Sequence, residues 1–209
     1  MSVNVLLFDF GGVIYTPLND EIVQKRREKL ADQLGFSDAN QMWQRFYAGV
    51  EWNLAKTGHI KEDEMWAELL APLGLKNRQE QKAFVFELYR DCGLKDDMRE
   101  LIVQLNMYYR LAILSNATDK LGTLLSGQLK VSKYFDLVVN SSDIRVAKPD
   151  NEAYFKTIEM LSVAPAEILF IDDQYRNTSA AEKLAIKSIV FKEIDQLRSD
   201  LMALDILAD

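Results

Sequence analysis

Cysteine is almost absent from this chain of 209 residues. The one cysteine, Cys92, cannot form an internal disulfide bond, and this composition suits a reducing compartment. Positive charge is also scarce. The chain has 25 Lys and Arg against 32 Asp and Glu, a net charge of −7, whereas nucleic-acid binding needs clustered basic residues. No apolar run is long enough to span a bilayer. We therefore expect a cytoplasmic protein without nucleic-acid or membrane partners.

Beyond about residue 100, short apolar runs alternate with segments whose apolar residues recur at helical spacing. Such alternation predicts right-handed crossovers and a parallel α/β sheet that is covered on both faces. The predicted strands are residues 3–8, 111–114, 137–139, 168–171 and 188–191, and the predicted helices are residues 98–109, 119–129, 151–161 and 178–184.

The segment from residue 18 to residue 92 contains no convincing strand but several amphipathic stretches. One helix face is predicted from Trp43 to Leu54, with Ser37 as a plausible N-cap. Asn77 and Glu80 have the spacing of a capping box for the next helix. The simplest interpretation is a helical insert of roughly 75 residues with a core of its own.

Side chains that can carry chemistry follow the first two predicted strands. Asp9 ends the first apolar run, and Gly11 and Gly12 then allow the backbone to turn sharply and to approach a ligand closely. Ser115 and Asn116 follow the second strand, where a hydroxyl, an amide and backbone N–H groups can bind an oxyanion. Open α/β sheets bind ligands at the carboxyl ends of their strands, so these residues are candidates for one site.

The next two strand ends add a cation and an acid pair. Lys148 precedes Pro149, which can hold the lysine as a fixed positive charge at the start of a helix. The fourth strand leads directly into Asp172 and Asp173, with Asn177 four residues further. Adjacent carboxylates repel each other and require a cation, and hard oxygen ligands favour Mg²⁺.

Each feature also has a purely structural interpretation. Ser115 could cap the helix that follows it, Lys148 could be a solvated loop lysine, and the two aspartates could cap a helix and favour its dipole. The conjunction favours a site, because an acid, a hydroxyl, a lysine and an acid pair occur in order at four strand ends. A carboxylate nucleophile, a hydroxyl anchor, a cation and a magnesium site are what phosphoryl transfer requires.

Taken together, these motifs resemble those of the haloacid dehalogenase superfamily of hydrolases. The resemblance covers nearly the whole chain and implies a Rossmann-like catalytic core, residues 1–15 and 93–209, with strand order 5-4-1-2-3. It also implies a mobile helical cap at residues 16–92. The matching motifs are Phe8-Asp9-Phe10-Gly11-Gly12-Val13, Leu114-Ser115-Asn116, Lys148-Pro149-Asp150, and Phe170-Ile171-Asp172-Asp173 followed by Asn177.

The resemblance implies a Mg²⁺-dependent phosphatase of small phosphorylated metabolites. Asp9 would attack phosphorus and form an aspartyl-phosphate, and Lys148 would screen the nucleophile from the charge of the phosphate. Ser115 and the backbone at Asn116 would hold the phosphoryl oxygens. Oligomeric state is left open between a monomer and a homodimer.

The same resemblance implies a metal site. Mg²⁺ would bridge Asp9, a phosphate oxygen and the Asp172/Asp173 pair, together with the backbone carbonyl of Gly11. Asp173 aligns better as the direct ligand, because Asn177 then falls at the spacing of the family's last acidic position, but Asp172 stays possible.

One position departs from the pattern. Phosphatases of this superfamily usually carry a second aspartate, the proton donor to the leaving group, where this chain has Gly11. Such a group typically contributes about 10²–10⁴-fold in rate. A working phosphatase could favour a substrate with a good leaving group, such as a sugar 1-phosphate, or borrow an acid from the cap. Glu21, Glu51 and His59 are conceivable, and the sequence does not select among them.

Two further hypotheses remain open. A 2-haloacid dehalogenase would attack carbon without a metal. The acid pair Asp172-Asp173 argues against this hypothesis, because a halide pocket gains nothing from two carboxylates. A catalytically weak or silent relative would bind a ligand or a protein partner, and retention of the nucleophile, lysine and metal acids argues against that.

Overall fold

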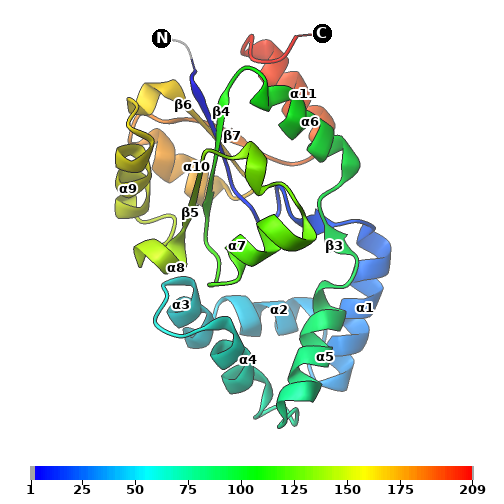
Figure 1. Cartoon of the computed structure of the whole chain (residues 1–209). Helices are drawn as coiled ribbons and strands as arrows, with labels where there is room; N and C mark the ends of the chain where they lie inside the picture. The colour runs from blue at the N-terminus through cyan, green and yellow to red at the C-terminus, as the bar shows by residue number, and fades with distance from the viewer. Residues whose placement is uncertain (1–2, 209) are drawn as a thin grey trace.

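The computed structural model describes residues 3–208, and a parallel five-stranded sheet forms its centre (Figure 1). The strands are β1 (Val5–Phe8), β4 (Arg110–Ser115), β5 (Leu137–Asn140), β6 (Ile168–Asp172) and β7 (Lys187–Val190). Their spatial order is β5-β4-β1-β6-β7, and every neighbouring pair is parallel. Counted along the chain, this is the predicted 5-4-1-2-3 order viewed from the opposite edge. The α/β fold class is confirmed.

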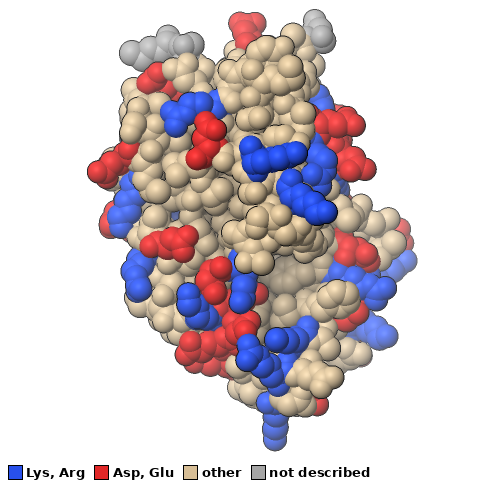
Figure 2. All heavy atoms as spheres, in the orientation of Figure 1, with Lys and Arg blue, Asp and Glu red and all other residues tan. Residues whose placement is uncertain are grey.

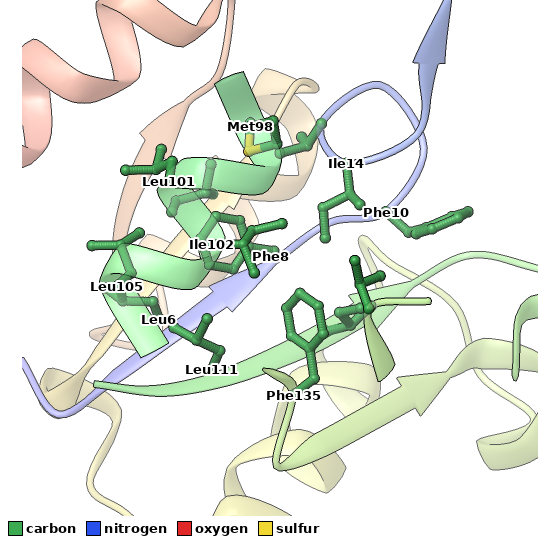
Figure 3. Close-up of a cluster of buried hydrophobic side chains, with 14 of the residues drawn as sticks. Leu6, Phe8, Phe10, Ile14, Met98, Leu101, Ile102, Leu105, Leu111 and Phe135 are labelled. Carbon is green, nitrogen blue, oxygen red and sulfur yellow. The ribbon is translucent and has the colours of Figure 1, made fainter. Parts of the chain in front are cut away.

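Two layers of helices cover the sheet because side chains of the central strand alternate between its faces. Leu6 and Phe8 pack on one face with α6 (Asp96–Asn106) and α11 (Ile194–Ala203), as the close-up in Figure 3 shows for α6. Val5 and Leu7 pack on the other face with α9 (Asn151–Leu161) and α10 (Tyr175–Glu182). All four side chains are fully buried, so β1 is the middle of the core.

Short helical segments complete this part of the chain. The helix predicted over residues 119–129 is instead a short α-helix followed by one π-helical turn, and the helix predicted over residues 178–184 begins three residues earlier. The remaining segments are α7 (Leu121–Thr123), the π-helix η1 (Leu124–Gln128), the 3₁₀ helices η2 (Ser132–Tyr134) and η3 (Pro165–Glu167), and α8 (Ser141–Ile144).

Five of the helices between β1 and β4 form a separate group, here called the five-helix group, which lies at the bottom of Figure 1. Its members are α1 (Asp20–Gln33), α2 (Ala39–Tyr47), α3 (Val50–Lys56), α4 (Glu62–Leu70) and α5 (Arg78–Tyr89). The group has its own apolar cluster, centred on Phe46, whose ring meets Phe36, Trp66 and Phe84 edge to face at 5.5–6.0 Å between centroids. The aromatic residues in this part of the sequence therefore serve as a core.

The local predictions for these helices are partly wrong. The helix predicted through Trp43 and Leu54 is two helices, because the chain leaves α2 at Ala48 and begins α3 from Gly49. The N-cap of α2 is Asp38, whose side chain accepts a hydrogen bond from the backbone of Gln41, and not Ser37. The predicted capping box of Asn77 and Glu80 is confirmed at the start of α5.

The five-helix group is joined to the sheet by a two-stranded ribbon and by close packing at its far end. The ribbon pairs β2 (Thr16–Pro17) with β3 (Cys92–Gly93), two short strands that the sequence did not predict. At the other end, Gly58 approaches the backbone of α8 so closely that a Cβ atom would lie 2.1 Å from the carbonyl oxygen of Ser142. The hydroxyl of Ser141 donates a hydrogen bond of 2.6 Å to the carbonyl of Lys56.

Charged side chains of both signs are interspersed over the face shown in Figure 2. Many of them pair, as Arg26 does with Asp91 and Arg45 with Glu51. Within residues 3–208, no helix has the length and apolar character needed to cross a membrane.

Gly58→Ala is expected to weaken the packing of the five-helix group against the sheet. Gly58 has φ +70°, so alanine costs about 1–2 kcal/mol in backbone strain and also clashes with Ser142. Gly35 is a matched control, since its φ of +79° imposes the same strain but nothing lies within 4 Å of its Cβ position. In urea unfolding, Gly58→Ala should lower the free energy of unfolding more than Gly35→Ala does. Equal decreases in the two variants would contradict the close contact.

Candidate functional site

The carboxyl edge of the sheet gathers the residues that the sequence singled out. Asp9 follows β1 directly, Ser115 is the last residue of β4, and Asp172 is the last residue of β6. Lys148 comes from the loop between α8 and α9. Parallel strands end at the same side of a sheet, and this brings together residues that are far apart in the chain.

A buried lysine joins two of the carboxylates. The Nζ atom of Lys148 lies 2.9 Å from Oδ1 of Asp9 and 2.7 Å from Oδ2 of Asp172. All three side chains are almost completely buried. The predicted alternative of a solvated Lys148 is therefore wrong. A charge removed from water in this way is stable only when it is paired, so the three residues depend on one another.

Burial shifts the protonation of this cluster. Loss of solvation raises the pKa of Asp9 from 3.8 to about 7, because it outweighs the attraction of Lys148 and acts with the repulsion of Asp172. Burial alone would lower the pKa of Lys148, but the two carboxylates reverse the direction and raise it. The lysine therefore stays charged, while Asp9 titrates near neutral pH. Perturbed groups of this kind are typical of functional sites.

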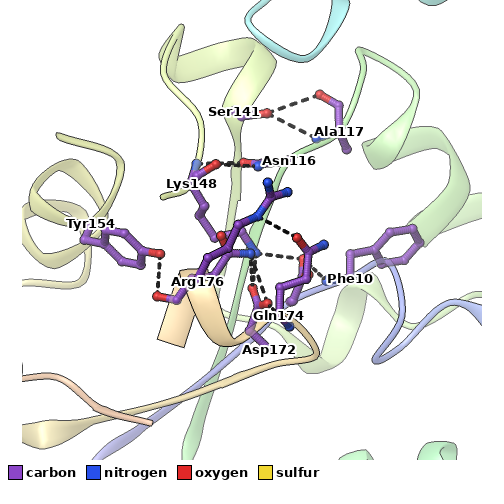
Figure 4. A network of polar contacts seen from close by, with 11 residues as sticks. Phe10, Asn116, Ala117, Ser141, Lys148, Tyr154, Asp172, Gln174 and Arg176 are labelled. Carbon is purple, nitrogen blue, oxygen red and sulfur yellow. Dashed lines mark hydrogen bonds and ion pairs between the residues drawn. The ribbon is translucent and has the colours of Figure 1, made fainter. Parts of the chain in front are cut away.

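Asn116 holds the lysine loop in place. Its side-chain amide donates to the carbonyl oxygen of Lys148 and accepts from the N–H of Lys148, both at 2.8 Å (Figure 4). The amide of Asn116 is thus occupied, whereas its backbone N–H has no acceptor within residues 3–208. Ser115, whose side chain is buried, likewise makes no hydrogen bond through its hydroxyl in that range and caps no helix. A free hydroxyl and a free N–H therefore adjoin each other at the end of β4.

The adjacent acids Asp172 and Asp173 differ in their surroundings. The carboxylate of Asp172 accepts from Lys148, from the backbone of Gln174 at 2.8 Å and twice from the amide of Asn177 at 3.0 Å. Its hydrogen-bonding capacity is nearly filled. Asp173 has no such donors and is partly exposed. Its pKa is raised, first by burial and then by the charge of Asp172.

Gly12 makes room for Asp173. Gly12 has φ +87°, and a Cβ atom there would lie 2.5 Å from an Asp173 carboxylate oxygen. Asp9, Asp172 and Asp173 each place an oxygen within 4.8 Å of the others. Hard oxygen donors around a point of unpaired negative charge fit Mg²⁺ better than a soft metal. The predicted metal residues are thus brought together, with Asp173 the acid whose oxygens are free.

The structure does not bring Glu21, Glu51 or His59 to this edge through any contact. Glu21 is exposed and pairs with Lys25 at 2.6 Å. Glu51 forms two hydrogen bonds to Arg45, which lower the pKa of Glu51 and make it a poor proton donor. The ring of His59 is exposed and contacts the hydroxyl of Thr57.

Sequence reasoning missed two polar residues beside the site. Ser141 accepts from the N–H of Ala117 at 3.1 Å and so joins the loops that follow β4 and β5. Thr118 is buried in the loop that follows β4, and its hydroxyl donates a hydrogen bond to the carboxylate of Glu62 in the five-helix group. Ser141 follows a predicted strand, so the rule that selected Ser115 would also have selected it. No local signal connects Thr118 with Glu62, which are 56 residues apart in the sequence.

Comparison with known proteins places this chain in a family. The family model for haloacid dehalogenase-like hydrolases matches residues 3–184. The chain belongs to the haloacid dehalogenase-like (HAD) hydrolases. A phosphoglycolate phosphatase of Aquifex aeolicus is 29% identical over 192 residues, which cover 88% of this chain and 82% of that protein. Haloacid dehalogenases of two bacteria also match.

Two further matches differ in length or show the fold alone. Drimenol cyclase of Aspergillus calidoustus is 22% identical over 95% of this chain, which spans only 36% of the cyclase. A HAD family enzyme of Bacteroides thetaiotaomicron, solved with magnesium and inorganic phosphate, aligns with a TM-score of 0.73 at 22% identity. That alignment covers 91% of this chain and 95% of the other, so the two folds agree over nearly their whole length.

Asp9→Asn is expected to stabilise the metal-free protein more at pH 8 than at pH 5. The folded-state pKa of Asp9, about 7, lies above its ordinary value of 3.8. Between about pH 4 and pH 7 the folded state therefore keeps a proton that the unfolded chain has released, and stability falls as pH rises. Asparagine cannot ionise, so the variant does not lose this stability as pH rises. The melting temperatures of native protein and variant are compared in EDTA from pH 5 to pH 8, with the exposed Asp150→Asn as the control. A difference between native and variant that is constant with pH would contradict the buried, titrating Asp9.

Proposed function

We propose that this HAD hydrolase is a Mg²⁺-dependent phosphatase of small phosphorylated metabolites that acts through an aspartyl-phosphate on Asp9. The observation that carries the proposal is the placement of Lys148 between Asp9 and Asp172, with the free carboxylate of Asp173 beside them. Three carboxylates and one ammonium group carry a formal charge of −2, which a divalent cation neutralises.

The contacts of Asp9 prepare one of its oxygens for attack. Oδ1 accepts from the backbone N–H of Phe10 at 2.6 Å and pairs with Lys148, so the carboxylate cannot rotate freely. Oδ2 has no hydrogen-bond donor within residues 3–208, and we assign it the bond to phosphorus. Lys148 offsets the repulsion between this carboxylate and an approaching phosphate, a role that a fixed cation fulfils without reorganisation.

The end of β4 supplies the second half of the site. The hydroxyl of Ser115 and the backbone N–H of Asn116 are free to bind the oxygens of the phosphoryl group. Asp9 and Asp173, with the carbonyl of Gly11, would hold Mg²⁺, which when bound stabilises the negative charge of the transferring group, and Asp172, whose oxygens already accept hydrogen bonds, would contribute mainly its charge. The five-helix group, the predicted cap at residues 16–92, would close over these residues and exclude water.

The relatives support a phosphatase without deciding its substrate. The Aquifex aeolicus protein is a phosphoglycolate phosphatase, and the Bacteroides thetaiotaomicron enzyme was solved with magnesium and inorganic phosphate. The dehalogenase matches favour a second candidate, the hydrolysis of 2-haloacids. A carboxylate that attacks carbon has no use for the Asp172/Asp173 pair, so we prefer the phosphatase.

Phosphate release should require Asp9. Native protein, Asp9→Asn and the control Asp150→Asn are compared with Mg²⁺ on phosphoglycolate, sugar phosphates and p-nitrophenyl phosphate. Asp150 is exposed and caps α9, a role that asparagine keeps. We expect Asp9→Asn to lose more than about 10³-fold in rate and Asp150→Asn to be unchanged. Release of chloride from 2-chloropropionate, with no phosphate release, would establish the dehalogenase instead.

Mg²⁺ binding is tested separately from turnover. At about 100 times its dissociation constant, a bound cation stabilises the folded state by about 2.7 kcal/mol, which raises the melting temperature by roughly 5–10 °C in a chain of this size. The shift should occur in the native protein and in Asp150→Asn and be lost in Asp173→Asn. An equal shift in Asp173→Asn would show that the acid cluster is not the metal site.

A further inference from the structure

Gly11 leaves the candidate site without a proton donor of its own. It lies two residues after Asp9, and a Cβ atom at Gly11 would meet nothing within 4 Å. A departing alkoxide needs a proton, because an alcohol is a poor leaving group when it departs as an anion. Among residues 3–208, the group that supplies this proton must then reach the edge of the sheet from another element.

The five-helix group brings one carboxylate to the loop that follows β4. Glu62 is the first residue of α4, and its backbone N–H donates to Oδ1 of Asp119 at 2.9 Å. Its carboxylate accepts a hydrogen bond from the buried hydroxyl of Thr118. Thr118 lies only three residues beyond Ser115, so Glu62 is anchored beside the proposed phosphate-binding loop.

The charge of Glu62 also acts on Tyr15, which belongs to the segment that contains Gly11. Tyr15 pairs with Gly11 in an isolated β-bridge, and its ring stacks on that of Phe10 at 5.4 Å. The pKa of Tyr15 is raised to about 12, mainly by burial and in part by the negative charge of Glu62. The hydrogen bond from Thr118 therefore places the carboxylate of Glu62 at the loop that follows β4, and its charge also acts on Tyr15, the residue that pairs with Gly11.

The surroundings of Glu62 suit a group that gives and takes a proton. Burial raises its pKa, a hydrogen bond from Thr118 opposes this, and the charge of Asp119 adds to it. The charge of Lys120, like the hydrogen bond from Thr118, lowers the pKa of Glu62. No ion pair joins Glu62 to a Lys or Arg within residues 3–208. Burial raises the pKa of Asp9 and Asp173 as well, and both belong to the candidate site. A half-buried carboxyl group without a salt bridge can hold its proton until the substrate needs it.

We propose that Glu62 is the general acid and base of the reaction, in place of the side chain that Gly11 lacks; this rests on the proposed phosphatase activity. As Asp9 Oδ2 bonds to phosphorus and the P–O bond to the leaving group breaks, the carboxylic acid of Glu62 donates its proton to the leaving oxygen. The resulting carboxylate then takes a proton from the water that attacks the aspartyl-phosphate. Inorganic phosphate and free Asp9 are released, and Glu62 is protonated again.

The test compares leaving groups of different basicity. Glu62→Gln keeps the size and the hydrogen bond from Thr118 but cannot donate a proton. We expect about a 10²–10⁴-fold loss of kcat on alkyl and sugar 6-phosphates and less than about 10-fold on p-nitrophenyl phosphate, whose leaving group departs without protonation. Asp63→Asn is the control, since Asp63 is the next residue, is exposed, and forms its ion pairs with Arg78 and Lys120 rather than with a residue of the proposed site.

A second variant separates acid chemistry from closure of the five-helix group. Because the space beside Gly11 is open, Gly11→Asp in the Glu62→Gln background restores a carboxyl group without changing the contact between residue 62 and Thr118. Recovery of turnover on alkyl phosphates supports the proposal. A loss that is equal on all substrates and is not recovered by Gly11→Asp overturns it and leaves Glu62 as a structural contact.

The same experiment distinguishes the failure of each proposal. If native protein releases phosphate through Asp9 and Glu62→Gln behaves as native on every substrate, the role of Glu62 is wrong and the phosphatase stands. If native protein hydrolyses no phosphate ester and Asp9→Asn changes nothing, the phosphatase is wrong, and the role of Glu62 is overturned with it.

Discussion

The ion pairs of Lys148 are the interaction on which the site depends. A buried ammonium group is costly to remove from water, and so are the carboxylates of Asp9 and Asp172 on either side of it. Each makes the burial of the others possible. The lysine is held twice, through its charge and through the two backbone hydrogen bonds to Asn116. The nucleophile of the proposed reaction is thereby aimed before a substrate arrives, which is the condition for electrostatic stabilisation without reorganisation.

This arrangement leaves a negative charge that the protein itself does not balance. Asp172 is satisfied by Lys148, Gln174 and Asn177, while Asp173 rests against Gly12 with its oxygens free. The unbalanced charge supports the proposed magnesium site, whereas the raised pKa of Asp9 comes first from burial and then from the repulsion of Asp172. It also implies that the site is a source of instability in the metal-free protein, as is common where burial is used to tune protonation.

In the proposed reaction, the five-helix group contributes a proton donor as well as a cover. Its contacts with the sheet are polar and specific: Lys56 with Ser141, Glu62 with Thr118, and the backbone of Gly58 with Ser142. They all fall on the segments that directly follow β4 and β5, the loop with Thr118 and the start of α8, close to the proposed phosphate-binding groups. Contacts of this kind form only when the two parts are together, so a proton donor carried by the five-helix group would be in place only in the closed arrangement.

The sequence by itself determined the sheet and the residues along its carboxyl edge. Alternating apolar runs specify parallel strands, and a residue that follows a strand must lie at that edge, so Asp9, Ser115 and Asp172 could be grouped without coordinates. Helix boundaries were less certain, because the break at Ala48 and Gly49 interrupts an apolar pattern that is continuous in the sequence.

Only the tertiary structure decided how these residues share their partners. Asp172 and Asp173 are adjacent in the sequence, and they differ in the structure because Lys148 and Asn177 reach one and not the other. Glu62 and Thr118 meet across 56 residues through the packing of the five-helix group on the sheet. Local pattern carries no information about such contacts, since their energy comes from burial between elements and not from the conformation of either one.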